Sequence, residues 1–334
     1  MAEVAVILPA KDCSRYIAQA LDSLLKQKYR DFECIIVYAK SSDQTRTIID
    51  AYISRDSRFK VYEGRGLGLA DDLNLGIEKA KSQYIFRLDA DDIARPNRIS
   101  TQIRYLKDGA HIVGGNVHYF GSTFPRNSNF PIGSCALKFY ALFRNPLAHP
   151  TVAFRRDLEL RYDPGYSGIE DYELWTRCLM TGSINIVNLE EVLIEYRVHK
   201  NQSTKLGEGE RVSRLRQELS GRMAKALNVP QEFRNILNKI SALDSINYQE
   251  TESIVGYISS VNEINSLDRV RILREVYLST QKLSHLEAIS LVSKSIHEQK
   301  KWWKGLINYC ILRYGSGPLD NISKLTRVFG VDNS

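Results

Sequence analysis

The sequence predicts an α/β fold in which helices flank a mostly parallel sheet, with a helical region at the C-terminal end. Two patterns predict this fold. Over residues 1–110, short apolar runs alternate with amphipathic helical patterns at a spacing of about 30 residues. From about residue 207 onward, the apolar spacing is helical without a clear strand. Alternating strands and helices favour right-handed crossovers and therefore parallel pairing.

The first half of the chain alternates regularly between strands and helices. Apolar runs at 4–8, 32–37, 59–62 and 84–88 predict strands, and the segments 14–28, 43–54, 68–81 and 95–106 predict helices. In the first helix, Ile17, Leu21 and Leu24 share a face, and Ser14 is a suitable N-cap. Pro96 is expected in the first turn of the fourth helix, where proline is tolerated.

Beyond residue 110 the alternation weakens. Strands are expected at 110–120, 151–154, 184–188 and 192–198, and a helix is expected at 171–180. Gly, Ser, Asn and Pro are frequent at 121–135, which predicts a loop. We therefore expect one domain over 1–206, with halves at about 1–110 and 111–206, and a helical region over 207–334.

The composition is typical of a soluble globular protein, with 43% apolar and 25% charged residues among 334. No apolar stretch approaches the roughly 18 residues that span a bilayer, and no secretory signal is visible. Five scattered cysteines without a Cys-x-x-Cys pair argue against a thiolate zinc site and suit a reducing cytoplasm. Most of the net charge of +7 lies in 201–334. A mildly basic, solvated surface is a sufficient explanation of this excess, although the positive charge could also bind anionic lipid.

Three carboxylates follow directly on the fourth expected strand. Side chains alternate in extended geometry, so Asp89 and Asp91 can point the same way. Acids packed together repel one another unless a cation neutralises them, and Mg²⁺ or Mn²⁺ takes carboxylate and phosphate oxygens as ligands. Because open α/β sheets bind ligands at the carboxyl ends of strands, these residues predict a metal–diphosphate site. The alternative is a solvated acidic turn, with Asp92 capping the next helix.

A glycine-rich segment at 64–68 lies between an expected strand and an expected helix. A dinucleotide fingerprint would need Gly or Ala where Leu69 stands, and it normally follows the first strand. A nicotinamide dehydrogenase is therefore not favoured. The glycines either let the backbone pass close to a nucleotide or form a turn.

Two acids and two histidines have both structural and chemical interpretations. Glu170 and Asp171 begin a helix, where the helix dipole stabilises acids, yet a carboxylate with a suitable pKa could deprotonate a hydroxyl. On spacing alone the two interpretations weigh equally. His199 ends the last expected strand and could ligate a carboxylate-bound metal, although lone histidines are more often packed or surface residues. His149 has the weaker functional claim.

Residues 300–314 combine lysines, two tryptophans and one apolar helical face. This combination suits a bilayer interface. A helix docked on the protein explains the same spacing and is favoured, so contact with an anionic membrane through 300–314 is the second interpretation.

Five segments occur in the order and spacing found in family 2 glycosyltransferases, which have the GT-A fold. They lie at 4–10, 68–77, 87–92, 170–175 and 196–199. The resemblance covers residues 4–204, about three fifths of the chain, and is far more specific than any one segment. It implies a GT-A domain over 1–206, with a nucleotide-sugar half at about 1–110 and an acceptor half at about 111–206.

The resemblance also implies roles for individual residues. Asp171 is expected to be the general base, and Asp89, Asp91 and His199 are expected to bind Mn²⁺ or Mg²⁺. The residues expected to bind the nucleotide sugar are Pro9, Ala10, Lys11, Asp12, Asp43, Gly68, Asp72, Asn74, Asp89, Ala90 and Asp91. The residues expected on the acceptor side are His149, Glu170 and Trp175.

One segment departs from the family pattern. After the second strand such enzymes usually have Asp-Asp-Gly-Ser, in which a carboxylate recognises the base. Here Tyr38 and Ala39 supply no acid, and Lys40 adds a positive charge. Asp43 retains the final acid of the pattern or simply caps the next helix. The departure leaves the nucleotide open and leaves room for an inactive or unusually selective member.

The resemblance implies metal-dependent, inverting transfer from a nucleoside-diphosphate sugar, by preference a UDP-sugar, to a hydroxyl of a glycan or lipid-linked acceptor in surface polysaccharide biosynthesis. The alternative is a non-catalytic nucleotide-sugar or glycan-binding component of a polysaccharide assembly complex. A nucleotidyltransferase is a third candidate, for which Lys11 alone is poor support. The expected location is the cytoplasm, at the inner face of the membrane if 300–314 binds it, and no nucleic acid partner is expected.

Overall fold

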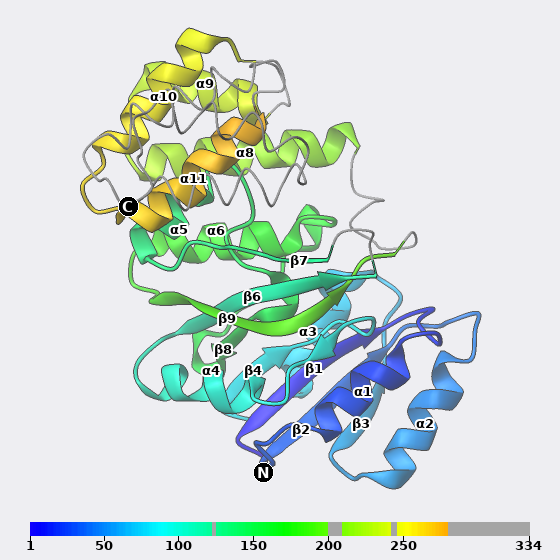
Figure 1. Cartoon of the computed structure of the whole chain (residues 1–334). Coiled ribbons are helices and arrows are strands. Elements are labelled where there is room, and N and C mark those ends of the chain that lie inside the picture. Colours follow the sequence, from blue (N-terminus) through cyan, green and yellow to red (C-terminus); the bar gives the residue numbers. More distant parts are fainter. Residues whose placement is uncertain (122–124, 200–208, 242–245, 280–334) are drawn as a thin grey trace, which may run out of the picture. The chain divides into compact units, whose positions relative to one another are not determined.

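A computed structural model describes residues 1–121, 125–199, 209–241 and 246–279 (Figure 1). By compactness the chain divides into units 1–282 and 283–334, and all the described residues lie in the first. The expected domain boundary at residue 206 stays a prediction, and the segment 300–314 lies outside the described residues. Within the described ranges, no helix is long and apolar enough to cross a bilayer.

The strands form one mixed sheet. They are β1 (Val4–Ala10), β2 (Phe32–Tyr38), β3 (Phe59–Glu63), β4 (Tyr84–Arg87), β5 (Ile93–Ala94), β6 (Ile112–Phe120), β7 (Arg126–Asn127), β8 (Ala153–Arg155) and β9 (Ile186–Arg197). Their order is β3-β2-β1-β4-β8-β6-β9-β5, and β7 pairs with β6. The longer ladders are parallel: they join β1 to β2 and to β4, β2 to β3, and β6 to β9. The ladders of β5, β7 and β8 are short and antiparallel. The predicted mostly parallel sheet is confirmed.

Helices flank this sheet and continue beyond it, as predicted. They are α1 (Ile17–Leu25), α2 (Thr45–Arg55), α3 (Leu69–Lys79), α4 (Arg98–Lys107), α5 (Ser134–Tyr140), α6 (Glu170–Thr181), α8 (Glu210–Ala226), α9 (Gln231–Ser241), α10 (Tyr248–Ser260) and α11 (Ser266–Ser279). Short 3₁₀ turns lie at η1 (His149–Thr151), η2 (Arg156–Leu158) and η3 (Pro164–Tyr166). The helical character of the C-terminal region is confirmed as far as residue 279.

The two faces of the sheet bury two separate cores, because successive side chains of a strand point to opposite faces. On β1, Val6 and Leu8 join a core with α1, α2 and α4. Ile7 of the same strand joins the other core, with α3, α5, α6 and the helices from α8 onward. In Figure 1 the C-terminal helices lie beside α5 and α6, and contacts join α8 to α6 and α11 to α5. Burial on both faces explains why the strands are continuous apolar runs.

Two expectations beyond residue 120 are corrected. The strands expected at 184–188 and 192–198 form the single strand β9, because its register against β6 passes from Leu189 directly to Val192. The two intervening acids, Glu190 and Glu191, bulge out into solvent, so the polar interruption ends neither the strand nor its pairing. The segment 121–135, expected to be a loop, contains β7 and the start of α5.

Two helix starts also differ from expectation. Helix α1 begins at Ile17 without a side-chain cap, and the backbone N–H of Ser14 instead donates to Asp43 at 2.9 Å. Ser14 as N-cap was therefore wrong. Pro96 lies before α4, which begins at Arg98, so it is not in the first turn. At Ser14, a contact between the loops after β1 and β2 thus replaces the local cap expected from the sequence.

Helix α11 holds the segment that leads into α5. The buried carboxylate of Asp268 accepts the backbone N–H groups of Ile132 at 3.0 Å and Gly133 at 2.9 Å. Arg271 donates to Asp268 at 2.8 Å and, through Nε, to Asn129 at 2.8 Å. The described part of the C-terminal helical region is thus tied to the half of the sheet domain that follows residue 111.

Candidate active site

The aspartates expected to bind a metal lie together directly after β4. One carboxylate oxygen from each of Asp89, Asp91 and Asp92 lies within 4.8 Å of the other two. The side chains of Asp89 and Asp91 are each 26% exposed, whereas Asp92 is buried. Asp89 and Asp91 can therefore meet a ligand from solvent, and their hard oxygen atoms suit Mg²⁺ or Mn²⁺.

Asp92 ties the end of β9 to this acidic turn. Its Oδ1 accepts the backbone N–H of Arg197 at 2.9 Å, and Arg197 Nε donates to the backbone oxygen of Asp91 at 2.9 Å. Burial, followed by the charges of Asp89 and Asp91, raises the pKa of Asp92 well above its ordinary value. Because α4 begins only at Arg98, the alternative in which Asp92 caps the next helix is wrong.

His199, directly beyond β9, reaches the same turn. Its Nε2 lies 2.9 Å from Asp91 Oδ2, and its ring centroid lies 4.8 Å from that of Tyr16. The structure therefore brings His199 to the expected metal-binding carboxylates. A neutral imidazole at this place could share a cation with Asp91.

Asp171, at the start of α6, lies in a second polar cluster. Asn145 Nδ2 donates to Asp171 Oδ2 at 2.6 Å, and the backbone N–H of Tyr172 donates to Oδ1 at 2.8 Å. Burial, followed by the charge of Glu170, raises the pKa of Asp171 to about 6. A carboxylate with such a pKa, held in one orientation by two donors, is suited to accept a proton near neutral pH.

The expected acceptor-side residues pack around Asp171. His149 Nδ1 lies 3.7 Å from Asp171 Oδ2, and its ring centroid is 6.2 Å from that of the fully buried Trp175. Glu170 is buried and accepts the backbone N–H of Gly168 at 2.6 Å. Since the Asp171 side chain is 21% exposed, it is the member of this group most open to an incoming hydroxyl.

Tyr162 fixes the ring of His149. Its hydroxyl lies 2.9 Å from His149 Nε2, and the two ring centroids are 5.5 Å apart. Burial, and then the charge of Arg87, hold the pKa of His149 well below its usual range. The imidazole is therefore neutral and does not neutralise Asp171.

Arg87, the last residue of β4, connects the two clusters. Its buried guanidinium donates to the carboxylate of Asp89. Its charge lowers the pKa of Asp89 and that of Asp171, in each case against the larger effect of burial. A single buried cation thus contacts the acidic turn and lies within electrostatic range of Asp171.

The loops after β1 and β2 are joined through two of the expected nucleotide-binding acids. Asp12 accepts the backbone N–H of Ser42 at 2.8 Å, and Asp43 accepts that of Ser14 at 2.9 Å. Lys11, which directly precedes Asp12, is exposed, whereas Ala10 and Ala90 are buried and Pro9 is half-buried. The carboxylates of Asp12 and Asp43 therefore shape this edge of the sheet, and Lys11 presents its charge to solvent.

The expected residues of the α3 region have different surroundings. Gly68 precedes the helix with φ 104°, a conformation that side chains rarely adopt. Asn74 donates to the Tyr162 carbonyl at 2.8 Å and accepts the Tyr162 N–H at 2.9 Å, so its amide joins the two halves of the domain. Asp72 is buried in the first turn of α3.

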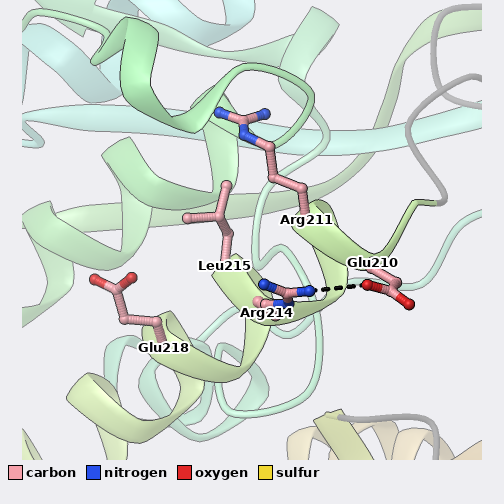
Figure 2. Close-up of a pocket in the computed structure, with 5 residues that line it drawn as sticks. All are labelled: Glu210, Arg211, Arg214, Leu215 and Glu218. Carbon is pink, nitrogen blue, oxygen red and sulfur yellow. Dashed lines mark hydrogen bonds and ion pairs between the residues drawn. The ribbon is translucent and has the colours of Figure 1, made fainter.

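A surface hollow along α8 lies beside the loop that precedes Asp171 (Figure 2). It is lined by Glu210, Arg211, Arg214, Leu215 and Glu218. Figure 2 shows Arg211 pointing away from Arg214, and Arg211 donates to the carbonyl oxygens of Gly165 at 2.6 Å and Ser167 at 3.1 Å. Helix α8 therefore supports the loop before the candidate base.

Comparison with known proteins identifies the family. Residues 5–162 match the family described as glycosyl transferase family 2. The O-antigen biosynthesis glycosyltransferase WbnJ of Escherichia coli is 33% identical over 210 residues, which cover 60% of this chain and 81% of WbnJ. The chain belongs to the family 2 glycosyltransferases. An uncharacterized glycosyltransferase of Haemophilus influenzae is 26% identical to this glycosyltransferase, over 84% of this chain and 87% of its own.

The name of another relative states its substrates. The UDP-Gal:alpha-D-GlcNAc-diphosphoundecaprenol beta-1,3-galactosyltransferase of E. coli is 30% identical over 59% of this glycosyltransferase and 74% of its own length. Among solved structures, S. aureus TarS in complex with UDP-GlcNAc has a TM-score of 0.56 at 15% identity, over 88% of each chain. The Pyrobaculum calidifontis mannosyltransferase in complex with GDP-Man and Mn²⁺ has a TM-score of 0.51 at 16% identity, over 93% of this chain and 85% of that one. These structures share the fold of this glycosyltransferase.

Sequence reasoning missed three residues of the site: Arg87, Asn145 and Tyr162. Arg87 was visible as a charged residue at the end of an apolar run, which is a detectable signal. Asn145 and Tyr162 have no such signal, because their contacts to Asp171 and His149 join segments 13 or more residues apart in the glycosyltransferase.

Proposed function

We propose that this glycosyltransferase transfers a sugar from a nucleoside-diphosphate sugar, by preference a UDP-sugar, to a hydroxyl of a glycan or lipid-linked acceptor, with inversion at the anomeric carbon. The main support is Arg87, a buried cation that contacts Asp89 and lowers the pKa of Asp171, and on this ground we assign the acidic turn and Asp171 to one site. The relatives named for O-antigen biosynthesis and for a diphosphoundecaprenol acceptor support a role in surface polysaccharide biosynthesis.

The donor would lie along the carboxyl ends of β1, β2 and β4, where open α/β sheets bind ligands. The segment from Pro9 to Asp12 would contact the base and ribose, and Lys11 would add positive charge. Asp89 and Asp91 would lie at the diphosphate. In this arrangement the partly exposed Asp89 and Asp91 would contact the donor, and the buried Asp92 would have a structural role.

A divalent cation fits the acidic turn. Asp89 and Asp91 are partly exposed carboxylates whose oxygens lie close together, and His199 Nε2 lies 2.9 Å from Asp91. When bound, Mn²⁺ or Mg²⁺ supplies positive charge against the departing diphosphate. Arg87 already contacts Asp89 and would keep that carboxylate in place.

Asp171 would accept the proton of the attacking hydroxyl. Asn145 and the backbone N–H of Tyr172 fix the plane of its carboxylate, and His149 stays neutral beside it. Attack from the face opposite the leaving diphosphate is a single displacement, which inverts the anomeric configuration. A positioned base of this kind typically contributes on the order of 10²–10⁴-fold in rate.

The test compares Asp171→Asn with the wild type in transfer and in donor binding. The variant is expected to lose transfer by at least about 100-fold while calorimetry shows unchanged binding of the donor. Asp157→Asn, which removes an exposed carboxylate ion-paired with Arg155, is the matched control and should behave as wild type. Normal turnover by Asp171→Asn would rule out the base, and a wild type that binds donors but transfers none would favour a non-catalytic binding component.

Location and membrane contact follow from this proposal. Lipid-linked acceptors with a diphosphate reside at a membrane surface, so the enzyme would work in the cytoplasm at the inner face of the membrane. The basic and aromatic segment 300–314 would make that contact. Sedimentation with vesicles containing anionic lipid, with and without residues 300–334, tests it.

A further inference from the structure

The two ring nitrogens of the buried His149 face two different groups. Its Nε2 lies 2.9 Å from the hydroxyl of Tyr162, and its Nδ1 lies 3.7 Å from Oδ2 of Asp171. A neutral imidazole carries its hydrogen on only one of these nitrogens, so one is a donor and the other an acceptor. The nitrogen that carries the hydrogen decides whether Asp171 faces an N–H or a lone pair.

The hydroxyl of Tyr162 decides between the two tautomers. Tyr162 is 3% exposed, and within the described residues its hydroxyl has His149 Nε2 as its hydrogen-bond partner. A hydrogen on Nε2 would leave the buried O–H without an acceptor and would turn the Nδ1 lone pair toward a carboxylate. A hydrogen on Nδ1 lets the O–H donate to Nε2 and turns an N–H toward Asp171. Because buried polar groups are almost always satisfied, the second arrangement is favoured.

Packing holds this imidazole in one orientation. The ring centroid of Trp175 lies 6.2 Å from that of His149 and 6.3 Å from that of Tyr162, and both contacts are edge-on. Asn74 binds the backbone of Tyr162 at both its N–H and its carbonyl oxygen. The three rings support one another, so Nδ1 stays on the side of Asp171.

The charged groups around these rings are Arg87 on β4, Asp89 directly after it, and Glu170 and Asp171 on α6. Burial raises the pKa of Tyr162, against the opposing charge of Arg87, so the phenol keeps its hydrogen. Burial and the same guanidinium keep His149 neutral. Neither ring therefore changes its charge where Asp171 titrates. An N–H directed at Asp171 stabilises the ionised carboxylate more than the protonated one.

We propose that Tyr162 and His149 form a positioning pair for the base, in which the Tyr162 O–H donates to Nε2 and the Nδ1–H faces Oδ2 of Asp171. The inference rests on Asp171 acting as the base in the proposed function. Both residues act through Asp171: they hold its carboxylate in place and favour its ionised form. The separation of 3.7 Å is longer than a hydrogen bond. Such contacts often tighten when the substrate binds.

The tautomer can be measured without any turnover. The experiment records the nitrogen-15 chemical shifts of the imidazole nitrogens in the full chain labelled with nitrogen-15 histidine, near pH 7.5. The signals of His149 are identified by their absence from His149→Asn. We expect a hydrogen on Nδ1 and an unprotonated Nε2. A hydrogen on Nε2, or a cationic ring, overturns the inference.

Kinetics test whether the pair acts on Asp171. His149→Leu removes the N–H, so the acid limb of kcat at saturating donor should move up by about 0.5 to 1 pH unit. The loss of kcat at pH 6 should then exceed the loss at pH 8.5 by about 2- to 6-fold, with the KM for the donor unchanged. His149→Asn carries an amide N–H near the place of Nδ1 and should keep the wild-type limb.

Tyr52→Phe is the matched control. It removes a buried hydroxyl that donates to the carbonyl oxygen of Ala18 at 3.0 Å and to Asp22 at 2.7 Å, between α1 and α2. This variant should be less stable than the wild type, but its acid limb should not move. A shift of the limb is therefore not a general consequence of losing a buried hydrogen bond.

Each outcome decides. An acid limb that stays in place in His149→Leu, or that moves as far in His149→Asn, overturns the inference. If His149→Leu does not fold, Tyr162→Phe replaces it and should show both tautomers and a limb moved in the same direction. A Tyr162→Phe variant with the hydrogen still on Nδ1 and the wild-type limb overturns the inference. A wild type that transfers no sugar overturns the proposed function, while the measured tautomer still tests the pair.

Discussion

Asn145 donates a hydrogen bond of 2.6 Å to Oδ2 of Asp171, while the other carboxylate oxygen accepts the backbone N–H of Tyr172. The second contact is local to α6, but the first comes from the loop between α5 and η1. The orientation of the candidate base therefore depends on a segment far from it in sequence. In the proposed reaction, the remaining lone pairs of this carboxylate would accept the proton of the attacking hydroxyl.

Replacing Asn145 by Ala should lower kcat by about 10- to 100-fold with little change in the KM for the donor. The variant loses the donor that holds Oδ2 and favours the ionised form, so its pH profile should also shift to higher pH. Steady-state kinetics across pH measures both effects. Asn235→Ala, at an exposed position of α9, is the control. A fall in stability with an unchanged pH profile would show that Asn145 is only structural.

The pH dependence of transfer should reflect the raised pKa of Asp171. A base must be ionised to accept a proton, so activity should fall as pH drops through the pKa of about 6 rather than through the ordinary carboxyl range. At one pH unit below the midpoint, about a tenth of the activity should remain. The kcat measured between pH 4.5 and 8.5 at saturating donor tests this, and an acid limb near pH 4 would contradict it.

Asp171→Asn should stabilise the protein at pH 7.5 although it abolishes transfer. The folded pKa of about 6 lies above the ordinary value of 3.8, so ionisation opposes folding, and this cost is fully present above about pH 6. Removing the charge should raise the free energy of unfolding by about 1–3 kcal/mol. Urea denaturation at pH 7.5 and pH 5 should show the gain shrinking at the lower pH. A less stable variant at both pH values would mean that the Asp171 charge is needed for folding.

Chelation should stop transfer, and loss of a ligand should weaken binding of the metal itself. EDTA is expected to abolish activity, with recovery on addition of Mn²⁺. Asp91→Asn should weaken Mn²⁺ binding by at least about 10-fold in calorimetry without donor, because Asp91 is an exposed carboxylate of the acidic turn. Asp50→Asn, on the exposed surface of α2, is the control. Full activity in chelator would remove the cation from the proposed function.

Most of the fold could be predicted from the sequence because both faces of the sheet are buried. Residues such as Val6 and Ile7 enter opposite cores, so the strand is apolar throughout and is recognisable without knowledge of its neighbours. Helix α5 could not be predicted. The N–H groups of the two residues before it, Ile132 and Gly133, donate to Asp268, 135 residues away from Gly133, and nothing local indicates that contact.

The candidate site was predictable where spacing alone brings residues together. Asp89 and Asp91 are two residues apart and their carboxylates lie close together as expected, although the chain there forms a turn, in which the N–H of Asp92 donates to the carbonyl of Asp89 at 3.3 Å, instead of the expected extended chain. Asn74 shows the limit of such predictions. The resemblance to the family implies that Asn74 binds the nucleotide sugar, but both polar atoms of its side-chain amide bond to the backbone of Tyr162. Asp72 shows a second limit. Nothing in the sequence around it reveals that one oxygen of its carboxylate is buried without a hydrogen-bond partner.

The last prediction concerns the link between α11 and the sheet domain. Asp268→Ala removes the acceptor of two backbone N–H groups and leaves the buried guanidinium of Arg271 without its closest acid. Breaking a buried pair in this way should lower the free energy of unfolding by about 3–5 kcal/mol, measured by urea denaturation. Glu210→Gln, at a highly exposed position of α8, should change it by less than about 0.5 kcal/mol.

The same variant should affect catalysis. The segment held by Asp268 leads through α5 to the loop that carries Asn145, so its release should lower kcat even at temperatures where the variant stays folded. Binding of the donor, which in the proposed function would lie at the carboxyl ends of β1, β2 and β4, should be unchanged. If Asp268→Ala kept wild-type stability and turnover, the contacts of Asp268 would have no part in holding the segment before α5 or in positioning Asn145.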